Sequence, residues 1–341
     1  MQKKLTEGKL LDKEGNLNEA GYSTSLVRDY NRDDIKAGKL RIKEWDYYYI
    51  GNNKFAVALT IDDNSYMRLG SVSVLEFDTK FWKTKSAMGF LSLGKTNLPP
   101  SSKVGSVNQD YKNLKLEFIN DGNNRHLIGY MKNFLPKQDF SCDFTLYDEP
   151  LDSLVIATPF DKPKYFYYNQ KINCMRVKGW AKVGDKTYDF EKEESFATLD
   201  WGRGVWTYKN TWYWSSLSCL ANDKRVGFNL GYGFGNTSAA SENIIFYDGK
   251  AYKVDQVVFN IPTDEKGKDD YLAPWTIKSN DGKVDLEFKP ILNRKDNTNL
   301  LILKSLQNQV FGHFSGTLKV DNEEIKIIDQ VGFAEKVTNY W

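Results

Sequence analysis

From residue 39 onward, the chain consists of short runs in which apolar and polar positions alternate. Tyr, Phe, Trp, Val and Ile fill these runs, and Asn, Asp and Gly separate them, which is typical of β-strands joined by tight turns. The pairs Asp248-Gly249 and Asp281-Gly282 supply the positive φ angles that two-residue hairpin turns require. No segment longer than about 12 residues carries a helical apolar stripe. The sequence therefore predicts an all-β protein made of antiparallel barrels or sandwiches.

An internal repeat strengthens this prediction. A shift of 137 residues aligns five identical pairs without a gap: Gly179/Gly316, Lys182/Lys319, Val183/Val320, Phe196/Phe333 and Ala197/Ala334. Any two β-hairpins look somewhat alike, but this match keeps both a hairpin turn and the strand after it in phase, so we favour duplication. It places a first barrel at residues 39–198 and a second at 199–341. Residues 1–38 are polar and lack the pattern, and we expect them to form an N-terminal arm.

Composition and charge indicate which classes of partner and which cell compartment to expect. The chain has 341 residues, about twice a typical domain, and its 47 basic and 45 acidic residues leave a net charge of +2. Without a basic patch we expect no nucleic-acid partner, and without about 18 consecutive apolar residues we expect no integral membrane segment. Residues 1–7 are not followed by the apolar region of a secretory signal. The odd, widely spaced cysteines Cys142, Cys174 and Cys219 indicate free thiols in a reducing compartment, so we expect a cytoplasmic protein.

The most distinctive segment runs from Asp200 to Trp214. Four of the nine tryptophans lie there: Trp201, Trp206, Trp212 and Trp214. In an extended strand Asp200 and Trp206 share one face, while Trp201 and Arg203 share the other. One interpretation is an aromatic-lined pocket, in which burial raises the pKa of Asp200 so that it serves as a general acid. The other is a scaffold, in which Asp200 and Arg203 pin two barrels together. We weigh the two equally, since ligand sites favour domain interfaces.

Two further segments offer candidate residues. Alternation in residues 44–49 puts Trp45 on one face, and Glu44, Asp46 and Tyr48 on the other. That second face is either a barrel lumen with two carboxylates or an outer polar face over an aromatic core, and we favour the outer face. Glu335 follows an apolar strand and is either a lumen carboxylate or a solvated strand end; we favour the strand end.

The sequence motifs of metal sites, serine hydrolases and nucleotide-binding proteins are absent. The two histidines, His126 and His313, and the scattered cysteines have no metal-ligand spacing. Neither a G-x-S-x-G elbow nor a P-loop is present, and the glycines of residues 231–235 do not have dinucleotide-binding spacing. We therefore expect neither a metal nor a cofactor.

The sequence resembles a bacterial family catalogued as domain of unknown function 2804. The resemblance rests on residues 41–48, 212–214 and 332–335, and above all on the block Asp200-Trp201-Gly202-Arg203-Gly204-Val205-Trp206. More distantly, the chain is similar to the tandem lipocalin-like carotenoid 1,2-hydratase, the AttH-like proteins and certain fungal cyclases. This resemblance implies two tandem antiparallel lipocalin-like (calycin-type) barrels. It carries over no catalytic residue.

The leading functional hypothesis is a site for a small hydrophobic molecule, in or between the barrels. The protein is then either a binder or a cofactor-independent hydratase, isomerase or cyclase. As an enzyme it would use Asp200 or Glu335 to protonate an alkene or enol, and Arg203 or Tyr213 to hold the polar end of the substrate. The expected apolar walls are Trp45, Trp201, Trp206 and Trp214. The alternatives are a non-catalytic lipid carrier and a glycan-binding or glycan-processing protein.

Overall fold

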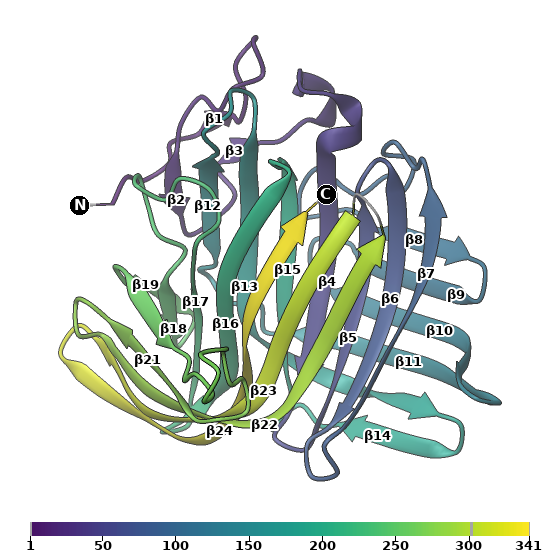
Figure 1. Ribbon diagram of the computed structural model, residues 1–341, viewed down its shortest axis with the longest axis vertical. Coiled ribbons are helices and arrows are strands. Elements are labelled where there is room, and N and C mark those ends of the chain that lie inside the picture. Colours follow the sequence, from purple (N-terminus) through teal and green to yellow (C-terminus); the bar gives the residue numbers. More distant parts are fainter. Residues whose placement is uncertain (1, 301–302, 341) are drawn as a thin grey trace.

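The computed structural model describes residues 2–300 and 303–340, and the fold is all-β (Figure 1). Two curled antiparallel sheets form a nearly closed barrel and a half-barrel. The first sheet has the order β7-β6-β5-β4-β15-β13-β11-β10-β9-β8, and the second has the order β19-β18-β17-β16-β24-β23-β22-β21-β20. The predicted fold class is therefore confirmed.

The strands of the first sheet, which we call the first barrel, alternate apolar and polar residues as predicted. They are β4 (Ile42–Gly51), β5 (Phe55–Asp63), β6 (Met67–Glu76), β7 (Phe81–Phe90), β8 (Val107–Tyr111), β9 (Leu114–Asn120), β10 (Arg125–Leu135), β11 (Gln138–Tyr147), β12 (Leu154–Pro159), β13 (Phe166–Val183), β14 (Lys186–Phe190) and β15 (Phe196–Val205). β12 and β14 both pair with the long strand β13.

The second sheet, which we call the half-barrel, contains the remaining long strands. They are β16 (Lys209–Ala221), β17 (Lys224–Tyr232), β18 (Ile244–Tyr247), β19 (Lys250–Lys253), β20 (Val257–Asn260), β21 (Trp275–Ser279), β22 (Val284–Leu300), β23 (Leu303–Val320) and β24 (Glu323–Tyr340). In Figure 1 the strands β22, β23 and β24 overlie the first barrel. The Tyr49 ring of β4 meets the Phe333 ring of β24 and the Phe311 ring of β23, with centroids 5.4 and 5.9 Å apart.

The N-terminal arm lies over the first barrel, as expected. Its short strands β1 (Gly8–Lys9) and β3 (Arg28–Asp29) pair with each other, and β2 (Gly21–Ser23) pairs with β12. Two 3-10 turns, Arg32–Asp34 and Lys39–Arg41, lead into β4. At its start the arm reaches the half-barrel, since the Lys3 amide donates to the Ala239 carbonyl at 2.8 Å.

Along its main path the first sheet repeats the strand order of the second, with β8 added at one end, and β2, β12 and β14 pair off this path. Gly179 on β13 and Gly316 on β23 occupy matching positions, at φ values of +155° and +142°. A Cβ on Gly179 would lie 2.1 Å from the Asp143 carbonyl oxygen, and one on Gly316 would lie 2.2 Å from that of Asp285. The shared strand order confirms that residues 179–197 and 316–334 lie at equivalent places in the two sheets.

The chain passes from one sheet to the other between Val205 and Lys209. β15 begins at Phe196 and pairs with β13 and β4 over its whole length, so the boundary expected after residue 198 falls inside a strand of the first barrel. A division into two domains stays a prediction, and the strand pairing favours residues 206–208 as its boundary.

The interior of the first barrel is filled rather than hollow. It contains Glu44, Asp46 and Tyr48, whose exposed fractions are 8% or less. Our preference for an outer polar face here was wrong. The half-barrel covers the other face of β4, so both faces of this strand are buried. The Glu44 carboxylate pairs with Arg32, and the Asp46 carboxylate pairs with Arg203 at 3.0 Å, so neither buried charge lacks a partner.

The three cysteines are buried free thiols. Burial raises the pKa of the Cys142, Cys174 and Cys219 thiols, so all three stay protonated and unreactive near neutral pH. In the described part of the chain, no helix has the length and apolar character needed to cross a membrane. The cytoplasmic location stays a prediction.

Candidate functional site

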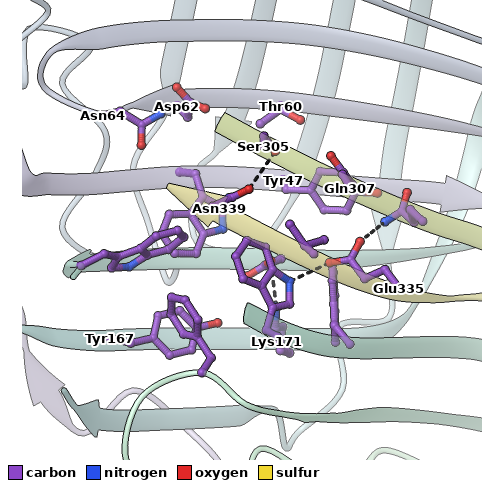
Figure 2. Close-up of a pocket in the computed structure, with 18 of the residues that line it drawn as sticks. Tyr47, Thr60, Asp62, Asn64, Tyr167, Lys171, Ser305, Gln307, Glu335 and Asn339 are labelled. Carbon is purple, nitrogen blue, oxygen red and sulfur yellow. Dashed lines mark hydrogen bonds and ion pairs between the residues drawn. The ribbon is translucent and has the colours of Figure 1, made fainter. Parts of the chain in front are cut away.

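A cavity of about 240 Å³ lies where the half-barrel covers the outer face of the first barrel (Figure 2). We call it the junction cavity. Its aromatic walls are Trp45, Tyr47, Tyr167, Trp206, Trp212, Trp214 and Phe234. Its charged groups are Asp62, Asp200, Glu242, Glu335, Lys171 and Arg294. An apolar enclosure with a few convergent polar groups is typical of small-molecule sites.

Trp206 is the centre of the aromatic wall. Its ring meets those of Phe234, Trp45 and Trp212 edge-on, with centroids 4.7, 5.1 and 6.1 Å away. Edge-to-face packing of this kind fixes the rings relative to one another. The aromatic wall is therefore rigid.

Gly202 and Gly204, in the Asp200–Trp206 block, lie where a larger side chain would clash with its neighbours. A Cβ on Gly202 would lie 1.9 Å from the Trp45 ring, and one on Gly204 would lie 2.4 Å from the Phe166 carbonyl oxygen. Glycine therefore allows the indole of Trp45 to lie flat across β15. This explains why the block that carries the resemblance alternates glycine with larger residues.

Asp200 is held as an ion pair. Its Oδ2 lies 2.8 Å from the Lys171 ammonium, and its Oδ1 accepts a hydrogen bond from the Asn169 amide at 2.6 Å. The same ammonium lies 3.8 Å from the centre of the Trp214 ring, which is a cation–π distance. Both carboxylate oxygens of Asp200 thus face hydrogen-bond donors, one from Lys171 and one from Asn169.

Glu335 lies inside the cavity, only 4% exposed. Our preference for a solvated strand end was wrong, because β24 runs through the junction and not along the rim of the sheet. The carboxylate accepts hydrogen bonds from the Trp212 indole and the Gln309 amide, each at 2.9 Å (Figure 2). Burial nevertheless raises the pKa of Glu335 above its ordinary value.

Glu242 is the second buried acid of the cavity, and it comes from the loop between β17 and β18. It is 7% exposed, and in the described part of the chain its carboxylate accepts no hydrogen bond. Burial raises the pKa of Glu242 to about 7, although the positive charge of Lys171 opposes this shift. A carboxyl with this pKa exchanges a proton near neutral pH.

Five of the eight predicted site residues come together in the cavity: Trp45, Asp200, Trp206, Trp214 and Glu335. The other three lie elsewhere. Trp201 and Arg203 point into the first barrel, where they are 1% and 0% exposed. Tyr213 lies on the opposite face of β16 from its neighbours and stacks on Tyr232, with ring centroids 4.4 Å apart. We therefore remove these three from the candidate site.

Sequence reasoning missed Lys171, Glu242 and Arg294. Lys171 lies in the middle of β13, and only the pairing with β15 brings it opposite Asp200. Glu242 lies in a loop, where no periodicity indicates its direction. Within residues 2–300 and 303–340, no group of three His, Cys, Asp or Glu side chains is arranged to hold a metal ion.

Comparisons with known proteins agree with this architecture. A family model described as "Domain of unknown function (DUF2804)" matches residues 2–341. Curated proteins gave no significant match. The structure of kievitone hydratase from Nectria haematococca aligns with a TM-score of 0.51 at 11% identity, over 97% of each chain. A putative AttH from Nitrosomonas europaea aligns with a TM-score of 0.54 at 10% identity, over 90% of this chain and 96% of the other. At such identities the likeness shows a shared fold.

Proposed function

The chain belongs to the DUF2804 family, as its sequence blocks predicted, and we propose that its junction cavity is the active site of a cofactor-independent enzyme. The proposed reaction is the addition of water to a carbon–carbon double bond of a small, largely apolar molecule, or its reversal. The observation that carries the proposal is the presence of two buried carboxyls, Glu242 and Glu335, in one tryptophan-walled cavity.

Glu242 is the proposed proton donor. Burial raises its pKa to about 7, and among the described residues no hydrogen-bond donor contacts its carboxyl oxygens. In the hydration direction, its O–H bond breaks and the proton bonds to one carbon of the alkene. The pKa match to neutral pH is what efficient general acid catalysis requires.

Glu335 is the proposed general base. The hydrogen bonds from Trp212 and Gln309 fix its carboxylate in one orientation. A water molecule bonds through its oxygen to the second alkene carbon and gives one proton to Glu335. The reaction adds one H and one OH without any change in electron count, and proton exchange with solvent restores the two carboxyls.

Asp200 takes a different role from the one we expected. Both of its carboxylate oxygens are already engaged, one by the Lys171 ammonium and one by the Asn169 amide. We assign it to positioning the Lys171 ammonium against the Trp214 ring. Burial raises the pKa of Tyr167 well above its ordinary value, so its hydroxyl stays protonated and available to donate a hydrogen bond to substrate.

The two alternative functions receive less support. A lipid carrier of the lipocalin type needs a hollow lumen, but the interiors of both sheets are filled by packed side chains. Glycan-binding sites present flat, open aromatic faces, whereas Trp206 and Trp212 pack edge-on into a rigid cluster. The name of the kievitone hydratase neighbour agrees with hydration chemistry.

The proposal is tested with a library of phenolics, terpenoids and unsaturated acids in water enriched in oxygen-18. We expect the wild type to convert at least one compound to a product that contains one oxygen-18 atom, detected by mass spectrometry. The Glu242→Gln variant should lose this activity, and Glu191→Gln, at an exposed loop position, should keep it. Absence of labelled product with every compound, or equal labelling by Glu242→Gln, would refute the proposal.

A further inference from the structure

The junction cavity continues into a second, larger space. A groove of about 670 Å³ lies between strands β5–β7 of the first barrel and the hairpin of β22 and β23. Six residues line both spaces: Tyr47, Thr60, Asp62, Arg294, Ser305 and Gln307. A ligand in the cavity therefore has a continuous path along the groove.

Arg294 lies where the cavity meets the groove. Its Nη1 donates one hydrogen bond, to the Ser73 hydroxyl at 2.6 Å. No carboxylate of the described residues lies within ion-pair distance of it. A guanidinium has five N–H donors in a fixed fork that fits a carboxylate. Arg294 thus presents unused donors to the shared space.

The rest of the groove suits an apolar chain that ends in a negative charge. Met67, Leu69, Trp82 and Met88 supply its apolar surface. Its cations are Lys83, Arg294, Lys295 and Lys304, and its acids are Asp62 and Asp296. Burial raises the pKa of Asp62 to about 8, so that acid is largely uncharged at neutral pH. The groove is therefore more positive than the chain as a whole, whose net charge is +2.

From this arrangement we propose that the ligand is an amphipathic carboxylic acid, whose carboxylate is bound by Arg294 and whose apolar part lies in the groove. The atoms next to the carboxylate then lie in the junction cavity, beside Glu335 and within reach of Glu242. This inference names the substrate class of the active site proposed above, and so it rests on that function. A carboxylate conjugated to the reacting double bond would also be polarised by the guanidinium.

The test compares two probes of equal length, decanoate and its neutral amide decanamide, by quenching of tryptophan emission. The wild type should bind decanoate about tenfold more tightly than decanamide, because a charge-assisted hydrogen bond is stronger than a neutral one. Arg294→Gln should bind the two probes equally, and Arg294→Lys should keep part of the preference. The exposed-site control Lys278→Gln should behave as the wild type.

A second variant guards against a folding defect in the Arg294 variants. Met88 is 43% exposed, so Met88→Glu should fold normally. It should weaken binding of decanoate about tenfold, through repulsion between the two carboxylates in the groove.

Wild-type protein that binds both probes equally, or that binds neither, would overturn the inference. If the inference fails in this way but oxygen-18 is still incorporated in a reaction that depends on Glu242, the proposed function remains supported. An acid preference that depends on Arg294, without labelling of any compound, would support the substrate class and refute the function.

Discussion

Arg203 and Asp46 form an ion pair inside the first barrel, with Arg203 Nη1 3.0 Å from Asp46 Oδ1. The guanidinium is 0% exposed and also donates to the carbonyl oxygens of Trp45, Gly202 and Pro99. The scaffold interpretation of the sequence placed Arg203 between two barrels together with Asp200, whereas the structure buries it within the first barrel and pairs it with Asp46. The pair fixes β4 to β15, the two strands that carry Trp45 and Asp200 to the cavity.

Removing the guanidinium should therefore be costly. Arg203→Ala leaves the Asp46 carboxylate buried without its partner, and we expect a loss of about 3–5 kcal/mol in the free energy of unfolding. Chemical denaturation measures it, with Lys278→Ala as an exposed control that should change by no more than about 0.5 kcal/mol. An equally small change for Arg203→Ala would show that the pair does not stabilise the barrel.

Because Gly179 and Gly316 occupy equivalent positions in the repeat, we expect their substitution to destabilise the protein in the same way. Gly179→Ala and Gly316→Ala each place a Cβ against a carbonyl oxygen of the neighbouring strand, at a φ that alanine rarely adopts. Each substitution should lower the free energy of unfolding by more than about 1 kcal/mol. Gly38→Ala is the control, because Gly38 has a φ of −58° and open space around it. If only one of the two variants is destabilised, the sites are not equivalent.

The N-terminal arm should hold the loop that carries Glu242. The Gln2 side-chain oxygen accepts a hydrogen bond from the Ser241 amide at 2.8 Å. In Gln2→Ala, exchange of the Ser241 amide hydrogen with solvent should accelerate about fivefold, since one hydrogen bond contributes about 1 kcal/mol. The Gly231 amide, which donates to Asn243, is the internal control. Unchanged exchange at Ser241 would mean that Gln2 does not hold this loop.

Glu242 should make stability depend on pH. Its folded-state pKa of about 7 lies above the ordinary value of 4.5, so the folded state binds this proton more tightly than the unfolded state does. The contribution of Glu242 to the free energy of unfolding is therefore fully present at low pH and is lost as the pH rises through about 7. Between about pH 5 and about pH 8, the wild type should lose about 2.5 kcal/mol relative to Glu242→Gln. Parallel pH profiles of the two proteins would contradict this.

The sequence predicted the fold well because strand periodicity and turn chemistry are local. The 137-residue shift located the equivalent strands, and alternation assigned Asp200 and Trp206 to one face and Trp201 and Arg203 to the other. The same alternation separates Tyr213 from Trp212 and Trp214. Tyr213 was chosen for its residue type, and its face would have excluded it.

The features that the sequence did not predict depend on contacts between the two sheets. Alternation says which residues share a face, but it cannot say that β4 and β24 are covered on both sides, so Glu44, Asp46 and Glu335 were assigned to solvent. Glu242 lies in a loop, and Arg294 reaches the site only because β22 crosses the first barrel. Neither has a local signature of its position.

The central claim is that the junction cavity holds a carboxyl that exchanges its proton near neutral pH. The most direct measurement is an NMR titration of protein labelled with carbon-13 at the glutamate carboxyl carbon, with the Glu242 resonance assigned by its loss in Glu242→Gln. Our account predicts a midpoint near pH 7. A midpoint near the ordinary value of 4.5 would mean that Glu242 is ionised throughout the neutral range, and the account would be wrong.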